Sequence, residues 1–195
     1  MARQAQLSKP NLDDYERVRG SFSWERAREE AAGLPGGGLN IAYEAVDRHV
    51  DEGRGDKVAL RWIARGQDRQ ELSYADLAEQ SARFCTALET LGVDRGDRVF
   101  TLLGRVPALY ISVLGIWKRG AVLSPLFSAF GPEPIKARMT IARPKALVTT
   151  RRLRRLPPGS PSGGRAGRRG SASPCARTGG EDFDTLLANA EPAAG

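Results

Sequence analysis

Between residues 40 and 150 the chain alternates between helical and strand-like patterns of apolar side chains. Apolar residues recur every three or four positions in some stretches and form short unbroken runs in others. The first pattern is typical of helices and the second of buried strands. We therefore predict helices near residues 40–51, 74–91, 107–119 and 132–142, and buried strands near residues 98–103, 121–124 and 146–150.

Local signals mark where these elements begin and end. Ser73 followed by Asp76 resembles a capping box at a helix start, and Pro107 suits a first helical turn. Gly92 and Gly120 suit the left-handed caps that end helices. Because short connections join strand, helix and strand, we expect right-handed crossovers and parallel strands. The predicted fold class is α/β, with a partial doubly wound sheet in the order β-α-β-α-β.

The residues before this unit have the pattern of a helix followed by a small hairpin. Residues 57–63 alternate, with Val58, Leu60 and Trp62 on one side, and a Gly-Gln-Asp turn leads into residues 69–72. His49 lies on the apolar face of the preceding helix. It is either a packed, hydrogen-bonded histidine or a catalytic base, and we favour the packed role.

Composition divides the chain into four segments. Residues 1–38 form a polar N-terminal extension, and residues 39–150 carry the α/β pattern. Residues 151–178 consist almost wholly of Arg, Pro, Gly, Ser and Ala, so they cannot bury enough apolar surface to offset the entropy of ordering. We predict disorder in that segment and a short helical remnant in residues 179–195.

The net charge of +7 is concentrated in the same segment. Residues 151–177 contain eight arginines and no acidic residue, and without them the formal charge would be −1. The basic balance therefore says nothing about the folded surface. An Arg/Gly-tailed RNA-binding protein is an alternative function, but the segment has no aromatic residue to stack on bases, so we expect no nucleic-acid partner.

The remaining composition argues against several other classes of protein. No apolar run approaches the ~20 residues of a membrane span, and the N-terminus lacks the apolar middle of a signal peptide. The two cysteines, Cys85 and Cys175, suggest neither a disulfide framework nor a metal site. We therefore expect a cytoplasmic protein with no membrane partner, in which Cys85 is a small buried hydrophobe.

Four motifs follow one another along the α/β part of the chain. They are NIAYEAVDRH at 40–49, LSYADLAEQSARFCTALETLGVDRGDRV at 72–99, an apolar helix ending in Gly-Ala-Val within 110–125, and FSAFGPEPIKARM at 127–139. In this order they resemble the N-terminal part of AMP-forming acetyl-CoA synthetases, in the adenylate-forming (acyl-CoA synthetase) superfamily. The resemblance implies that the predicted sheet is an incomplete part of that family's N-terminal domain.

The resemblance also implies a reaction, that of an acetate–CoA ligase. Such enzymes activate acetate or another short-chain carboxylate with ATP and Mg²⁺ and then pass the acyl group to CoA. The family holds the triphosphate in a loop that ends in Lys, whereas this chain has no Lys after Lys145. We therefore expect an N-terminal fragment that is inactive and binds none of these ligands alone, with residues 151–178 hypothesised to be a frameshifted stretch.

Candidate site residues come from the fourth motif. The family has a Phe-Gly-Gly-Phe loop along its CoA channel, which implies CoA contacts for Phe127, Ser128 and Ala129. Phe127 and Phe130 match the family, whereas Ser128 and Ala129 replace the glycines and put a close backbone approach in doubt. Two core aromatics bracketing a turn are the alternative. Arg138 is either a phosphate contact or part of a solvated helix face, and we favour the latter. The resemblance carries over no catalytic or metal-binding residue.

A third function also stays open, that of a non-catalytic interaction protein that associates with an intact synthetase. We expect unpaired strand edges and an uncovered apolar helix face at residues 111–114. Such surfaces lead a chain to aggregate or to require a partner.

Overall fold

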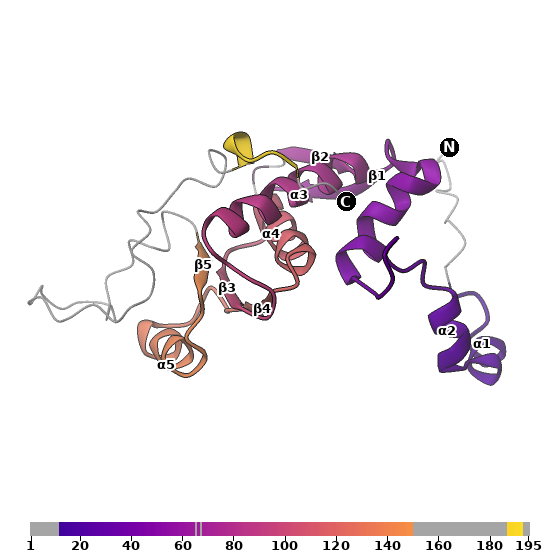
Figure 1. Cartoon of the computed structure of the whole chain (residues 1–195), viewed down its shortest axis with the longest axis horizontal. Helices are drawn as coiled ribbons and strands as arrows, with labels where there is room; N and C mark the ends of the chain where they lie inside the picture. The colour runs from indigo at the N-terminus through magenta and orange to yellow at the C-terminus, as the bar shows by residue number, and fades with distance from the viewer. Residues whose placement is uncertain (1–11, 65, 67, 150–186, 193–195) are drawn as a thin grey trace, which may run out of the picture.

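The structure is a computed structural model that describes residues 12–64, 66, 68–149 and 187–192. The predictions for residues 151–178, and for most of residues 179–195, lie outside these residues. Figure 1 shows a central α/β body, with an N-terminal arm on one side and helix α5 on the other. The arm, residues 12–38, contains helices α1 (Tyr15–Ser21) and α2 (Trp24–Glu29), whose side chains include none that is buried.

A helix over residues 41–54 joins the arm to the body, close to the predicted 40–51. It includes two π-helical stretches, η1 (Tyr43–Asp47) and η2 (Val50–Arg54). Asn40 fixes its start, because the side-chain oxygen of Asn40 accepts a hydrogen bond of 2.8 Å from the Ala42 N–H. The Asn40 side-chain amide also donates to the Trp117 carbonyl at 2.9 Å, which ties this helix to the body.

The predicted hairpin is confirmed. Strands β1 (Val58–Ile63) and β2 (Arg69–Ser73) pair antiparallel. Leu60 and Trp62 are half-buried as the alternation predicts, but Val58 is exposed. A register shift between Val58 and Leu60 interrupts the alternation, and Ala59 packs against the core beside Leu60.

Helix α3 (Tyr74–Thr90) follows, and its predicted capping box is confirmed. The Ser73 hydroxyl accepts from the Asp76 N–H, and the Asp76 carboxylate accepts from the Ser73 N–H. The Ser73 N–H, and after it the Ser73 hydroxyl, donate to the Asp76 carboxylate and hold the pKa of this carboxyl below its usual value. The predicted apolar stripe faces inward, with Leu77, Phe84 and Leu88 buried.

The predicted β-α-β-α-β unit is present in full. It comprises β3 (Arg98–Leu102), α4 (Pro107–Lys118), β4 (Val122–Pro125), α5 (Pro132–Ala142) and β5 (Ala146–Thr149). The strands are parallel in the order β4-β3-β5, so the chain crosses over β3 on its way from β4 to β5. The doubly wound α/β prediction is therefore confirmed for the described residues.

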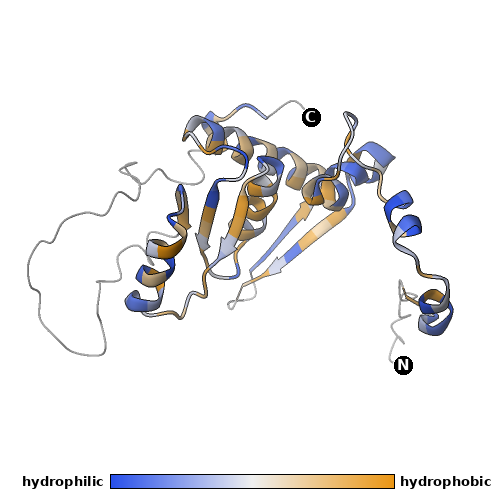
Figure 2. Ribbon diagram, turned by 60° about the horizontal axis from the view of Figure 1, so that its bottom comes forward, coloured by the Kyte–Doolittle hydropathy of each residue, from blue (hydrophilic) through white to orange (hydrophobic). Residues whose placement is uncertain are grey.

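Two apolar clusters lie on opposite faces of this sheet. Val99 and Val148 belong to the larger cluster, which α3 and α4 cover, whereas Phe100 and Leu147 belong to a smaller cluster under α5. Alternation along each strand sends neighbouring side chains to opposite faces, which explains the two clusters. Figure 2 shows the apolar strands between the helices.

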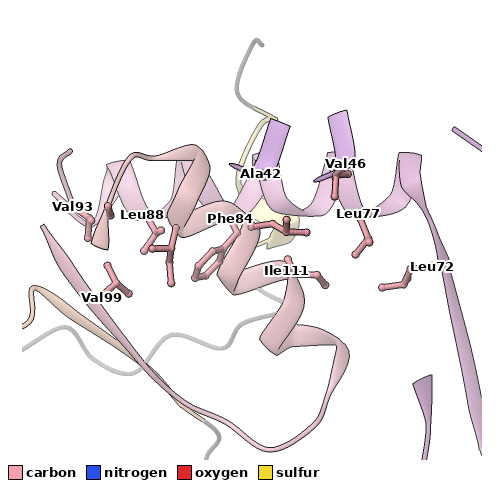
Figure 3. Close-up of a cluster of buried hydrophobic side chains, with 12 residues drawn as sticks. Ala42, Val46, Leu72, Leu77, Phe84, Leu88, Val93, Val99 and Ile111 are labelled. Atoms are coloured by element: carbon pink, nitrogen blue, oxygen red, sulfur yellow. The ribbon is translucent and has the colours of Figure 1, made fainter. Parts of the chain in front are cut away.

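The larger cluster joins the body to the helix at 41–54. Figure 3 shows Ala42 and Val46 of that helix beside Leu77 and Phe84 of α3 and Ile111 of α4. Burial of these side chains is the main stabilising contribution that fixes the helices on this face. The cluster also receives Leu187 from the short segment 187–192, where the Ala190 carbonyl accepts a 2.9 Å hydrogen bond from Arg83.

The expectation of an uncovered helix face at residues 111–114 was wrong. Ile111 is 3% exposed, Ser112 is fully buried and Leu114 is 8% exposed. The apolar stripe of α3 packs directly on this side of α4, so each of the two stripes covers the other. The exposed large apolar side chains of the unit lie outside residues 111–114: Tyr110 on α4 is 43% exposed, Val122 on β4 51%, Phe127 64% and Ile141 on α5 84%.

Candidate functional site

The carboxyl edge of the parallel sheet is where the topology places a binding site. The loop after β3, residues 103–106, leads to α4 on one face, and the loop after β4, residues 126–131, leads to α5 on the other. In open α/β sheets, ligands bind outside the carboxyl ends of two neighbouring strands whose following helices lie on opposite faces of the sheet. The three candidate residues, Phe127, Ser128 and Ala129, lie in the second of these loops.

The loop Phe127–Phe130, called here the aromatic loop, is well defined. It starts from a fixed point, because the Leu126 N–H donates to the Thr101 carbonyl at 2.7 Å. The Phe130 N–H then donates to the Phe127 carbonyl at 2.9 Å and closes the turn. The two rings meet edge to face, with centroids 5.6 Å apart. The loop therefore holds two aromatic rings at the sheet edge.

The rings are not both part of the core, contrary to the alternative that the sequence left open. Phe127 is 64% exposed, Ser128 and Ala129 are exposed, and only Phe130 is half-buried. An exposed aromatic ring beside a small hydroxyl offers a surface for stacking and for hydrogen bonding. A serine hydroxyl acts as a nucleophile only where an adjacent base activates it, and the loop itself contains no such base.

Arg138 lies beside the loop. Its guanidinium carbon is 4.4 Å from the centroid of the Phe130 ring, and one of its nitrogens donates to the Pro134 carbonyl at 3.0 Å. The side chain is exposed, as favoured from the sequence, but it is also engaged with the aromatic loop. Sequence reasoning missed this contact; the only signal was that Arg138 shares the packing side of α5 with Ile135 and Met139.

The hairpin reaches the same edge of the sheet. The Trp62 indole N–H donates to the Arg105 carbonyl at 2.7 Å, which joins β1 to the loop between β3 and α4. Nothing in the sequence pattern indicated this contact, because it joins residues 43 positions apart. This hydrogen bond fixes the hairpin beside the carboxyl edge of the sheet.

Two other residues singled out in the sequence have structural roles. The His49 ring packs edge to face on Tyr74, with centroids 4.6 Å apart, and its Nδ1 accepts a hydrogen bond from Arg54. The packed role of His49 is therefore confirmed. Cys85 is buried, as predicted, and this burial raises the pKa of its thiol.

A polar network on the helix at 41–54 holds the N-terminal arm. The Glu44 carboxylate accepts from the Gly33 N–H at 2.6 Å and from the Ala32 N–H at 3.2 Å. Arg48 donates to that carboxylate and to the Glu30 carbonyl, both at 3.1 Å. The backbone N–H of Gly33 is the main cause that lowers the pKa of Glu44, followed among the favourable contacts by Ala32 and Arg48.

Other kinds of site receive no support from the described residues. Within residues 12–149 and 187–192, apart from the gaps at 65 and 67, no group of three or more His, Cys, Asp or Glu side chains is placed to hold a metal ion. In the same part of the chain, no helix is both long and apolar enough to cross a membrane.

Comparison with known protein families gives one match over most of the chain. A sequence model described as "AMP-binding enzyme" matches residues 46–189. This range includes the whole β-α-β-α-β unit and the aromatic loop.

Curated relatives are similar over the same region. Acetyl-coenzyme A synthetase of Bacillus subtilis (strain 168) is 38% identical over 144 residues, which are 73% of this chain and 25% of that protein. Acetyl-coenzyme A synthetase of Halorhodospira halophila (strain DSM 244 / SL1) is 36% identical over 140 residues, 71% of this chain and 22% of that protein. The chain thus spans about a quarter of the length of these relatives.

Solved structures are similar in fold. An acyl-CoA synthetase of Brucella canis superposes with a TM-score of 0.72 at 31% identity. The superposed region is 93% of this chain and 34% of the Brucella chain. A benzoate CoA ligase of Burkholderia xenovorans LB400 superposes with a TM-score of 0.60 at 23% identity, over 80% of this chain and 29% of its own. The second likeness is one of fold alone.

Proposed function

This chain belongs to the AMP-binding enzyme family, and from that premise we propose that it supplies the N-terminal part of an AMP-forming acyl-CoA synthetase. The proposed substrate is acetate or another short-chain carboxylate, as the fourth sequence motif suggests. The observation that carries the proposal is the aromatic loop at the carboxyl edge of a doubly wound sheet. We propose a cytoplasmic location, and the four segments 1–38, 39–150, 151–178 and 179–195 as its domain organisation.

CoA fits the aromatic loop in chemical terms. It carries a flat adenine base and a flexible arm ending in the thiol that accepts the acyl group. Phe127 offers an exposed ring for stacking, and the exposed Ser128 and Ala129 leave the backbone approachable from solvent. We therefore propose that Phe127, Ser128 and Ala129 contact CoA.

We propose that this chain alone binds neither ATP nor Mg²⁺. The described residues include no carboxylate cluster of the kind that binds metal ions, and the sequence has no Lys after Lys145 to complete a phosphate-binding loop. No step of the reaction is therefore assigned to this chain. We propose that the 195 residues alone do not form an acyl-adenylate, because positioning and charge stabilisation supply most of the barrier reduction in such transfers.

The activity proposal is tested with the purified chain. We expect acetate-dependent pyrophosphate release to stay at the level of a blank without protein, with an intact acetyl-CoA synthetase as the positive control. A turnover within tenfold of the ~10 s⁻¹ typical of enzymes would overturn it.

The CoA proposal is tested separately, by NMR titration of the isotope-labelled chain with millimolar CoA. Resonances of residues 127–129 should shift, and Phe127→Ala should weaken the apparent affinity by about tenfold, the usual loss for one stacking contact. Ile63→Ala is the matched control, because Ile63 is a similarly exposed apolar residue, 58% against 64%, in the hairpin. Shifts that Phe127→Ala leaves unchanged would place CoA elsewhere.

Association with an intact synthetase is a second candidate function. It is favoured by α5, a helix in which no residue is fully buried and in which Ile141 is 84% exposed. Co-purification of the tagged chain with an intact acetyl-CoA synthetase would support this role. Separate elution at every concentration tested would argue against it.

A further inference from the structure

Arg138 contacts the aromatic loop without lying in it. Its guanidinium lies over the Phe130 ring, at 4.4 Å from the ring centroid, and is oriented by the hydrogen bond to the Pro134 carbonyl one helical turn earlier. Phe130 in turn meets the exposed Phe127 ring edge to face. A continuous set of contacts therefore runs from α5 through Phe130 to the ring that faces solvent.

Two backbone hydrogen bonds, from Leu126 to Thr101 and from Phe130 to Phe127, also restrain the aromatic loop. Ser128 and Ala129 are nevertheless exposed, and Gly131, the N-cap of α5, has no side chain to restrain the end of the loop. An exposed loop loses conformational entropy when a ligand binds, and that loss weakens binding unless the loop is already ordered. A cation over an aromatic face is a restraint of the right kind, because it fixes the plane of the ring.

We propose that Arg138 is a positioning residue for the aromatic loop: it fixes Phe130 and, through Phe130, the exposed Phe127 ring in the orientation that meets CoA. The part concerning CoA rests on the proposed function. The role requires the flat guanidinium and not merely a positive charge, because an ammonium group cannot cover the ring in the same way. Arg138 acts here through Phe130 and not as a phosphate ligand.

The test compares Arg138→Lys and Arg138→Ala with Lys136→Ala, a control that removes an exposed charge from the same helix. Hydrogen exchange, followed by NMR on the full chain without ligand, reports the Phe130 N–H, whose hydrogen bond to Phe127 closes the loop. We expect both Arg138 variants to exchange this proton about two- to fivefold faster, as the loss of an exposed cation–π contact implies. Lys136→Ala should match the unmodified chain, and unchanged exchange in β3 verifies that each variant is folded.

A CoA titration of the same proteins separates this inference from the proposed function. Similar losses of apparent CoA affinity in both Arg138 variants support positioning. Full retention of affinity by Arg138→Lys, with loss in Arg138→Ala, would make Arg138 a charge contact to phosphate and overturn the proposal. Unaltered Phe130 exchange in both variants would also overturn it. If the unmodified chain binds no CoA while Phe130 exchange still rises, the CoA site fails and the positioning of the loop by Arg138 is upheld.

Discussion

At the residue scale, Gly115 shows how closely α3 and α4 pack. A Cβ at this position would lie 2.8 Å from Cδ1 of Phe84 and 2.9 Å from the Ser81 carbonyl oxygen. Phe84 is only 2% exposed and the second contact is backbone, so neither neighbour has room to move. The helix propensity gained from alanine, about 1 kcal/mol, is therefore outweighed by overpacking, which costs about 1–3 kcal/mol.

We predict that Gly115→Ala lowers the free energy of unfolding by up to about 2 kcal/mol, measured by urea denaturation. Gly104→Ala is the control, because a Cβ there meets nothing within 4 Å. It should change stability by less than about 0.5 kcal/mol. Equal stability of the two variants would show that α3 and α4 can move apart without loss.

Thr101 allows a prediction of the opposite sign. Its side chain is 1% exposed, and its hydroxyl makes no hydrogen bond within the described part of the chain. Thr149, on the neighbouring strand, donates its hydroxyl to the Leu102 carbonyl at 3.0 Å. We expect Thr101→Val to gain about 1 kcal/mol and Thr149→Val to lose about as much, again in urea. A loss in both variants would reveal a partner for the Thr101 hydroxyl.

At the scale of elements, the N-terminal arm depends on the helix at 41–54. Neither α1 nor α2 buries a side chain, so the hydrophobic contribution to its attachment is small. The arm is instead attached by polar contacts of Glu44 and Arg48 with residues 30–33. Glu44 accepts from two backbone N–H groups, and hydrogen bonds to a charged acceptor are the stronger kind.

We predict that Glu44→Gln speeds amide hydrogen exchange at Gly33 by about tenfold at neutral pH, whereas Glu29→Gln on α2 leaves it unchanged. Acid should lower protection at Gly33 as well, where protection is the intrinsic exchange rate at each pH divided by the observed rate. Because the folded arm lowers the pKa of Glu44, its contribution is complete above the ordinary glutamate pKa and is lost as the pH falls through the lowered value. Protection at Gly33 that changes with neither the substitution nor the pH would show that other contacts hold the arm.

Local elements could be predicted from the sequence because each depends on nearby residues. The Ser73–Asp76 capping box and the apolar stripe of α3 are complete within their own segments, and both are present. Contacts across the fold could not be predicted in the same way. Two such contacts are those of Trp62 with Arg105 and of Arg138 with Phe130. They depend on how separate elements are placed in space, which the periodicity of apolar residues does not indicate.

The misjudged face of α4 has the same cause. The sequence showed an apolar helix, but not that the stripe of α3 would cover residues 111–114. For the candidate site, the family resemblance of residues 127–139 singled out the aromatic loop, whereas its place at the carboxyl edge, the exposure of Phe127 and the contact of Arg138 with Phe130 required the structure.

At the scale of the whole molecule, β4 and α5 leave apolar side chains exposed on the β-α-β-α-β unit. β4 is an edge strand within the described residues, with Val122 51% exposed, and α5 presents Ile141 at 84% exposure. An unpaired strand edge and an exposed apolar helix side favour association with another chain.

We predict that the purified chain self-associates through these exposed side chains, and that Val122→Thr combined with Ile141→Lys shifts it toward the monomer. Threonine keeps the strand propensity of valine, and an exposed lysine discourages apolar contact, so the fold should be retained. Ile111→Lys is the contrasting control: Ile111 is 3% exposed, so a charge there should unfold the chain and increase aggregation.

Sedimentation velocity over about two decades of concentration measures the effect, since association shifts with concentration. A chain that sediments as a monomer throughout, with or without the two substitutions, would show that these exposed side chains do not form an interface between copies.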